Sequence, residues 1–459
     1  MLSHLSETTA DAVPIWPVTK SGLGKWCKER GGGDAAWVAA CGFAAEPGKF
    51  LLLPGARGKL AGVLLGVESE PDLWTYAGLP TALPPGLYHI AAKLAMTQAS
   101  AAALGWALGA YAFVRYRDKP GPEAATLAWP AGADRRHVAR SAAAIRLVRD
   151  LVNTPAGDLG PAELAEAAET LAAAHGAKAA VIVGDDLLAR NYPLVHAVGR
   201  ASTRAPRLVD ITWGKPQHPK ITLVGKGVCF DSGGLDLKPS SGMALMKKDM
   251  GGAATVLGLA GMLMDAALPI RLRVLVPAVE NAVAGNAFRP GDVLRSRQGS
   301  TVEIGNTDAE GRLILADALA EADGEAPDVL IDCATLTGAA RVALGPELPA
   351  LFTDDDAFAA DLARHGKATS DPHWRLPLHR PYRALMDSKV ADINNAGEGG
   401  MAGAITAALF LKDFVHKART WAHFDLYAWN QKARPGRPAG GEAMLLRALF
   451  ALIAERYGR

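Results

Sequence analysis

Cysteine is scarce in this sequence, with four residues in a chain of 459, and none of them forms a C-x-x-C pair. The four are widely spread, at Cys27, Cys41, Cys229 and Cys333. This excludes a small disulfide-stapled scaffold, in which cysteines would be dense and paired. Scattered thiols are typical of a reducing compartment, so the sequence predicts a cytoplasmic protein.

An excess of one charge is also absent. Lysine and arginine number 49 against 47 aspartate and glutamate residues, which leaves a formal net charge of +2. A dedicated binder of nucleic acid or of anionic membranes normally carries a basic excess or a basic tract. We therefore expect neither of these partners.

Long hydrophobic runs are absent as well. The longest apolar stretch, residues 251–268, is rich in glycine and alanine and is interrupted by Asp265, which predicts a buried helix rather than a membrane span. Residues 1–17 have no basic start and no apolar core, because Glu7 and Asp11 interrupt them. No secretory signal and no membrane association are expected.

What remains is the composition of an ordinary globular protein, 49% hydrophobic and 21% charged. At roughly 150 residues per domain, the length predicts two or three domains. Short apolar runs at residues 49–54 and 60–67, followed by an alanine-rich helical stretch at 87–108, indicate a small α/β domain at the N-terminus.

A boundary is predicted in the segment 117–132, where proline, glycine and polar residues gather. A helical pattern at 135–152 follows it. We place the break near residue 133, which divides the chain into an N-terminal α/β domain, 1–133, and a larger second domain, 134–459.

Apolar, β-branched runs alternate with helical stretches in the second domain. The runs predicted as strands are 179–183, 208–213, 221–224, 270–276 and 329–332. This alternation predicts an α/β fold with a mostly parallel central sheet covered by helices on both faces. Ligands of such folds gather at the carboxyl ends of the strands.

Charged residues lie among glycines just after apolar, strand-like runs in two segments, 223–252 and 304–313. A phosphate-binding loop is the first interpretation to test, because Gly225-Lys226 follows a predicted strand. The glycine spacing of that motif and its Ser or Thr after the lysine are both missing. A dinucleotide-binding fingerprint fails too, since no third glycine stands in register.

A metal site is the second interpretation. No two histidines are four residues apart, and none lies between His218 and His365, so oxygen ligands would have to dominate. Four carboxylates of the same two segments, on Asp231, Asp249, Asp308 and Glu310, are expected on loops at strand ends. Clustered carboxylates repel one another, and divalent cations would relieve this repulsion, as in two-metal hydrolytic sites. By spacing alone, Lys226 is a salt-bridge partner of these carboxylates.

Two motifs carry a resemblance to a known family. Residues 306–313 read Asn-Thr-Asp-Ala-Glu-Gly-Arg-Leu, and residues 224–234 read V-G-K-G-x-x-F-D-S-G-G, followed by Lys238 and Asp249. The sequence resembles the leucyl aminopeptidase (cytosol aminopeptidase) family of two-metal exopeptidases from about residue 151 to the C-terminus. The first ~130 residues match that family's smaller domain by position only. The resemblance implies that 134–459 is a catalytic metallopeptidase domain.

The resemblance also implies a cofactor set of two divalent metal ions per subunit, Mn²⁺ or Zn²⁺ and possibly Mg²⁺, together with bicarbonate. Asp231 and Glu310 would bridge the metals, Lys226 and Asp249 would complete one site, and Asp308 the other. A hydroxide activated by the two metals would attack the scissile carbonyl of a peptide whose free amine binds a metal. Lys238 would stabilise the oxyanion, and Arg312 would hold the bicarbonate as general base.

A substrate pocket is implied around Met246, Thr335, Leu336 and Gly338. Met246 taken alone is more typical of a core residue. Tyr427 replaces a small pocket residue of the family, which puts a strict preference for leucine in doubt. The resemblance implies peptide substrates and a homohexamer. A two-metal phosphoesterase and a catalytically idle scaffold or binding protein of the same fold stay open as alternatives.

Overall fold

The computed structural model describes residues 2–118, 121 and 123–458. The chain forms two compact units, one of Met1–Arg146 with Gln431–Ala439 and one of Leu147–Asn430 with Gly440–Arg459. The break expected near residue 133 falls just before α5 (Arg135–Asn153), the helix within which the two units divide. Residues 119, 120 and 122 of the expected boundary segment lie outside the described residues.

The first unit contains a six-stranded sheet in the order β1-β6-β5-β2-β4-β3. All pairs are parallel except the edge pair of β3 and β4. The strands are β1 (Leu5–Ser6), β2 (Val13–Val18), β3 (Phe50–Pro54), β4 (Leu60–Gly66), β5 (Leu87–Ile90) and β6 (Thr126–Ala128). The helices are α1 (Leu23–Arg30), α2 (Gly32–Ala40), α3 (Leu79–Ala82) and α4 (Met96–Gly109).

One local expectation for this unit is wrong. The stretch from residue 87 was expected to be helical throughout, but its first four residues form β5, which pairs with β2 and β6. Tyr88 is buried against Trp106 of α4, so burial in the sheet decides this segment. The helix itself begins only at Met96.

The second unit confirms the predicted α/β fold with a mostly parallel sheet. Its nine-stranded sheet runs in the order β16-β15-β18-β14-β9-β11-β8-β7, and β10 pairs with β11. Five of the strand pairs are parallel, and the antiparallel pairs involve β7, β8 and β15. The strands are β7 (Lys178–Val183), β8 (Arg207–Trp213), β9 (Lys220–Gly225), β10 (Gly227–Asp231), β11 (Arg271–Asn281), β14 (Val329–Ala334), β15 (Ala350–Phe352), β16 (Trp374–Arg375) and β18 (Thr420–Asp425).

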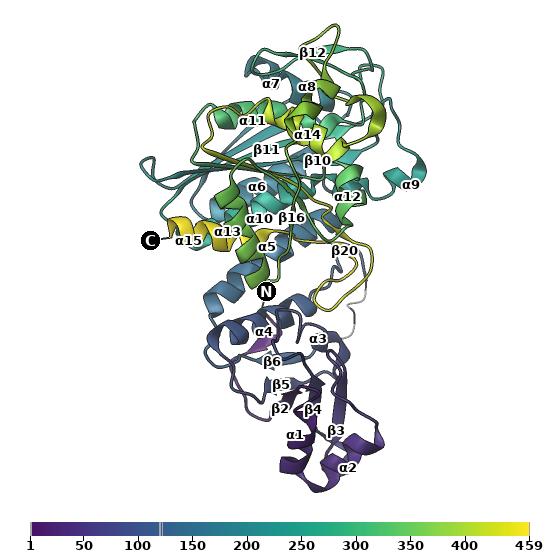
Figure 1. Cartoon of the computed structure of the whole chain (residues 1–459), viewed down its shortest axis with the longest axis vertical. Helices are drawn as coiled ribbons and strands as arrows, with labels where there is room; N and C mark the ends of the chain where they lie inside the picture. Colours follow the sequence, from purple (N-terminus) through teal and green to yellow (C-terminus); the bar gives the residue numbers. More distant parts are fainter. Residues whose placement is uncertain (1, 119–120, 122, 459) are drawn as a thin grey trace. The chain divides into compact units, whose positions relative to one another are not determined.

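Helices cover both faces of this sheet, with α8, α11 and α14 on one side and α6, α10, α13 and α15 on the other (Figure 1). Because both faces are covered, the central strands are almost continuously apolar, as in β9 and β14. The helices are α6 (Pro161–Ala174), α7 (Asp186–Ala189), α8 (Pro193–Gly199), α9 (Ser240–Met243), α10 (Gly251–Asp265), α11 (Glu310–Asp323), α12 (Gly338–Leu344), α13 (Asp356–Ala368), α14 (Gly403–Lys412) and α15 (Leu446–Tyr457). Smaller sheets contain β12 (Val293–Arg295), β13 (Thr301–Glu303) and β17 (Ile393–Asn394), and β19 (Trp429–Asn430) with β20 (Gly440–Gly441).

The polar residues singled out in the sequence lie where strands end. Lys226 follows β9, Asp231 is the last residue of β10, and Thr335 follows β14. Glu310 begins α11. Because the central strands are parallel, their carboxyl ends place these side chains along one edge of the sheet. Among the described residues, no helix is long and apolar enough to cross a membrane.

Candidate active site

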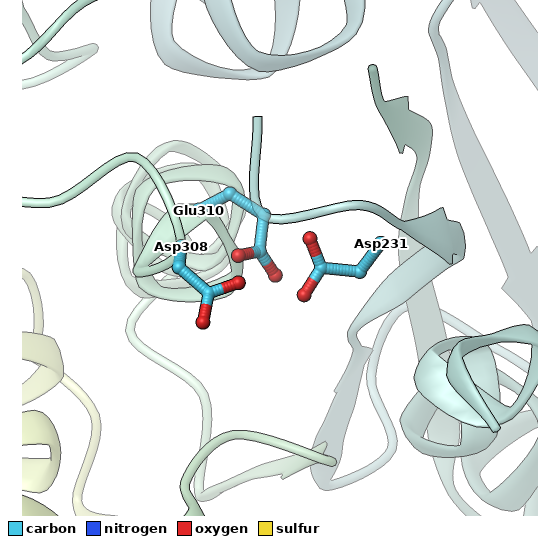
Figure 2. Close-up of side chains that lie close together, drawn as sticks. All are labelled: Asp231, Asp308 and Glu310. Carbon is cyan, nitrogen blue, oxygen red and sulfur yellow. The ribbon is translucent and has the colours of Figure 1, made fainter. Parts of the chain in front are cut away.

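Three carboxylates converge at this edge of the sheet. One ligand atom each of Asp231, Asp308 and Glu310 lies within 4.8 Å of the other two. Figure 2 shows the three side chains pointing toward one another, Asp231 from one segment and Asp308 and Glu310 from another. Asp231 and Glu310 are buried, and Asp308 is half-buried. Carboxylates packed this closely repel one another unless positive charge or protons separate them.

Two lysines supply part of that positive charge. Lys226 Nζ lies 2.7 Å from Asp249 Oδ2 and 2.9 Å from Glu310 Oε1. Lys238 Nζ lies 2.8 Å from Asp231 Oδ2 and 2.5 Å from Asp308 Oδ1. The structure therefore brings together all four carboxylates and both lysines selected from the sequence.

The charged form of each lysine is stabilised by these neighbours. Burial by itself lowers the pKa of Lys226, but the negative charges of Asp249 and Glu310 together outweigh this effect. The pKa of Lys226 is therefore raised overall. The pKa of Lys238 is raised in the same way, with burial opposed by Asp231 and Asp308. The contacts of Lys226 with Asp249 and Glu310 are salt bridges, the kind of contact that spacing alone predicts. It could ligate a metal only after losing a proton, because an ammonium has no lone pair.

The carboxylates still carry unrelieved repulsion. Burial and the charge of Asp231 raise the pKa of Glu310 to about 8 and that of Asp308 to about 6. Glu310 Oε2 is buried and has no hydrogen-bond partner among the described residues. A divalent cation that prefers oxygen ligands, such as Mn²⁺, Mg²⁺ or Zn²⁺, fits this donor set and would replace the protons.

Two asparagine side chains that the sequence motifs do not mark hold the acidic loops in place. Asn281 Nδ2 donates to Asp231 Oδ1 at 2.9 Å and to the Thr307 carbonyl at 3.1 Å. Asn395 Oδ1 accepts from the backbone N–H of Gly305 and of Asn306 at 2.8 and 3.1 Å. Asn281 ends the apolar strand β11, so the strand-end signal that selects Asp231 could also have selected it.

Glycine is required beside Lys226. A Cβ atom at Gly311 would lie 2.5 Å from Lys226 Cε and 2.7 Å from its Nζ. The first turn of α11 can therefore approach the lysine only because residue 311 has no side chain.

Arg312 is half-buried and occupies the next position of α11. Burial lowers the pKa of its guanidinium to about 10. Its Nη1 donates to the Asn395 carbonyl at 2.7 Å, while its Nε is buried without a hydrogen-bond partner among the described residues. An unpaired buried donor on a guanidinium suits a small planar anion.

A cavity of about 440 Å³ opens beside these groups. Its lining includes all four residues expected to bind substrate, Met246, Thr335, Leu336 and Gly338, and also Lys226, Asp231, Lys238, Asp249, Asp308 and Arg312. Thr335 joins the pocket to the acidic cluster, because its Oγ1 donates to Asp249 Oδ1 at 2.8 Å and its carbonyl accepts from Lys226 Nζ at 3.0 Å.

Asp425 supports the next two residues of the pocket wall and was also missed. Its Oδ1 accepts from the backbone N–H of Leu336 at 3.0 Å and of Thr337 at 3.2 Å, and its Oδ2 accepts from Thr337 Oγ1 at 2.6 Å. Asp425 is buried at the end of β18, which pairs with β14. It fixes the turn that follows β14.

Two further cations line the pocket. Lys248 Nζ lies 4.8 Å and Arg341 Cζ 4.9 Å from the centroid of the Tyr427 ring. Lys248 is only 3% exposed, and its burial lowers the pKa of its ammonium to about 8. Tyr427 is the residue that departs from the family pattern, whereas no sequence motif marks either cation.

Family models match nearly the whole chain. Residues 146–450 match the catalytic domain of the cytosol aminopeptidase family, and residues 13–130 match the N-terminal domain of the M17 aminopeptidases. The chain belongs to the cytosol aminopeptidase family. Membership confirms the predicted class of enzyme, a metal-dependent exopeptidase of the leucyl aminopeptidase type.

Individual proteins of the cytosol aminopeptidase family align over most of their length. A probable cytosol aminopeptidase of Leifsonia xyli is 40% identical over 457 residues, covering 93% of this chain and 92% of that protein. Peptidase B of Pectobacterium carotovorum is 43% identical over 361 residues, covering 76% and 83%.

Solved structures of the family show the same fold. The crystal structure of cytosol aminopeptidase from Coxiella burnetii has a TM-score of 0.95 and 49% identity, with 99% of each chain covered. The bottromycin maturation enzyme BotP, in complex with Mn, has a TM-score of 0.86 and 35% identity, with 97% of this chain and 99% of that chain covered.

Proposed function

We propose that this enzyme releases N-terminal residues, leucine-like or broader, from peptides, with its metal ions held by Asp231, Asp249, Asp308, Glu310 and Lys226. The observation that carries the proposal is the buried carboxylate cluster at the cavity wall, in which Glu310 Oε2 has no protein partner among the described residues. Two divalent cations bound there would polarise the scissile carbonyl and make a water nucleophilic at neutral pH.

Lys238 has the position of an oxyanion stabiliser in this proposal. It lines the cavity, and its charged form is stabilised by Asp231 and Asp308. Its side chain is 14% exposed, so a substrate carbonyl oxygen can approach the ammonium where little water competes.

Arg312 would hold bicarbonate as the general base. Its Nη1 is committed to the Asn395 carbonyl, and its Nε is available for an anion. None of the described residues lining the cavity is a histidine, and Lys226 and Lys238 already pair with the lining carboxylates Asp231, Asp249 and Asp308. An exogenous base is consistent with this lining.

Turnover tests the proposed function. The Mn²⁺-loaded protein should hydrolyse leucine p-nitroanilide and dipeptides, and a chelator should abolish this activity. p-Nitrophenyl phosphate, the substrate of a phosphoesterase, serves as the control and should not be hydrolysed. Absence of any chelator-sensitive release of an N-terminal residue would overturn the proposal. Added bicarbonate should raise the rate of an enzyme prepared in bicarbonate-free buffer.

We also propose an oligomeric state and a cellular location from membership of the family. A homohexamer is proposed, and light scattering should then give the mass of six copies of the 47.9 kDa chain. A cytoplasmic location is proposed because relatives are named cytosol aminopeptidases and the cysteines are unpaired. Fractionation of cells that express the protein at its natural level tests the location.

A further inference from the structure

Two cations share one aromatic ring on the wall of the substrate cavity. Lys248, Arg341 and Tyr427 all line the cavity, and both cations lie within 5 Å of the centroid of the Tyr427 ring, at 4.8 and 4.9 Å. Lys248 is buried, whereas Arg341 is exposed in the last turn of α12. The ring therefore fixes two positive charges beside the space that a substrate would occupy.

The guanidinium of Arg341 folds back over Gly338. A Cβ atom at Gly338 would lie 3.6 Å from Arg341 Nη2. Gly338 is one of the residues expected to bind the substrate side chain, and it lines the same cavity. Arg341 thus reaches the specificity part of the pocket rather than pointing away from it.

Both cations contact the Tyr427 ring, and within the described part of the chain neither makes an ion pair or a side-chain hydrogen bond. Two carboxylates of the same lining already have other partners. Asp249 contacts Lys226 and Thr335, and Asp425 accepts hydrogen bonds from Leu336 and Thr337. A buried ammonium without a counter-ion is unfavourable, so a ligand that supplies a carboxylate gains affinity.

We propose that Lys248 and Arg341 select peptides whose N-terminal side chain carries a carboxylate, glutamate or aspartate, with Tyr427 holding the two cations in place. This rests on the proposed aminopeptidase function and names its substrate class. A leucine side chain in the same space would leave both cations without a partner and would have to displace their water.

Substrates of nearly equal volume test the effect of the side-chain carboxylate charge alone. We would compare kcat/KM of the Mn²⁺-loaded enzyme for glutamate, glutamine and leucine p-nitroanilides, because glutamate and glutamine differ in charge at nearly equal volume. The glutamate-to-glutamine ratio is expected to be about tenfold or more, the size of one charge-assisted contact. A ratio near one together with good hydrolysis of leucine p-nitroanilide would overturn the specificity and leave the aminopeptidase function intact. Hydrolysis of none of the three would overturn the function itself.

Variants assign the selectivity to the two residues. Arg341→Met and, separately, Lys248→Met should each bring the glutamate-to-glutamine ratio toward one. Arg341→Lys keeps the positive charge and should retain part of the preference for glutamate. A loss of folding or of metal lowers both rates together and leaves their ratio unchanged. Lys215→Met, which removes one exposed charge from the loop between β8 and β9, is the control and should retain the wild-type ratio. If Arg341→Met and Lys248→Met both keep that ratio, the assignment is wrong.

Discussion

Lys226 Nζ lies 2.9 Å from Glu310 Oε1, and the same ammonium contacts Asp249 Oδ2 at 2.7 Å. These contacts pair a lysine at the end of β9 with a glutamate at the start of α11. A single ammonium cannot neutralise both carboxylates and also the adjacent Asp231 and Asp308, for which Lys238 is the second cation. The protein thus assembles more negative charge than its own lysines balance here, which is the electrostatic basis of a metal site.

Metal binding is expected to depend steeply on pH. In the metal-free protein, burial and Asp231 raise the pKa of Glu310 to about 8 and of Asp308 to about 6, so bound cations must displace protons. Apparent Mn²⁺ affinity should rise as pH increases from 6 to 8. Calorimetric titration in two buffers of different ionisation enthalpy measures the proton release. An affinity independent of pH over this range would contradict the prediction.

The same shifts give a sign for the stability of the metal-free protein. A carboxyl group whose pKa is higher in the folded than in the unfolded state retains a proton that the unfolded chain has lost. Glu310 therefore contributes stability to the folded protein that is lost as pH rises from the ordinary pKa of a glutamate toward the raised pKa of about 8. Urea unfolding in the presence of a chelator should show this decline, and saturating Mn²⁺ should remove it.

Asn281 is expected to act as a positioning residue for Asp231. Asn281→Ala removes the 2.9 Å hydrogen bond to Asp231 Oδ1 and should weaken metal affinity by about 10- to 100-fold, as other supports of metal ligands do. Calorimetric titration with Mn²⁺ measures the effect. Asn286→Ala removes a hydrogen bond to the Arg200 carbonyl on the exposed surface and is the control. Equal affinities of the two variants would refute the role.

Asp425 is expected to be needed for stability as well as for the substrate turn. Asp425→Ala leaves the N–H groups of Leu336 and Thr337 without their acceptor and should lower the free energy of unfolding by about 1–3 kcal/mol. It should also raise KM, because these residues line the cavity. Asp354→Ala removes an exposed ion pair at 3.4 Å and should change the free energy of unfolding by less than about 1 kcal/mol. Urea unfolding compares the two, and equal effects would contradict the prediction.

A methyl group at position 311 should displace Lys226. Gly311→Ala places a Cβ atom 2.5 Å from Lys226 Cε, so the lysine must shift from its position between Asp249 and Glu310, and kcat/KM should fall by about 100-fold or more. Gly24→Ala is the control, because no atom lies within 4 Å of its added Cβ and α1 is then expected to gain about 0.5–1 kcal/mol of stability. Normal activity of Gly311→Ala would show that the lysine position is not critical.

Sequence reasoning finds the acidic residues because their signal is local. Asp231 and Glu310 each stand beside glycines at the end of an apolar run, and the family motifs cover both. The fold class follows from the alternation of apolar runs and helices, which the sheet of the second unit confirms. For Lys226, spacing predicts a salt bridge, which its contacts to Asp249 and Glu310 form, whereas family resemblance predicts a metal ligand, which stays a prediction.

Residues whose role depends on a distant partner are not found this way. Asp425 acts on a turn 88 residues away in sequence, and Asn395 on a loop 89 residues away. Lys248 and Arg341 become a pair only because both reach Tyr427. Gln431–Ala439 joins the first unit although the sequence around it belongs to the second, and no local pattern marks this return.

The central claim is that the carboxylate cluster binds the metal on which turnover depends, and Mn²⁺ titration of the wild type and of Glu310→Gln tests it most directly. The substitution keeps the volume of the side chain and removes its charge, and Glu169→Gln on the exposed face of α6 is the control. We predict that Glu310→Gln loses Mn²⁺ binding by more than about 100-fold and loses leucine p-nitroanilide hydrolysis with it. Mn²⁺ affinity and turnover equal to those of the wild type would contradict this account.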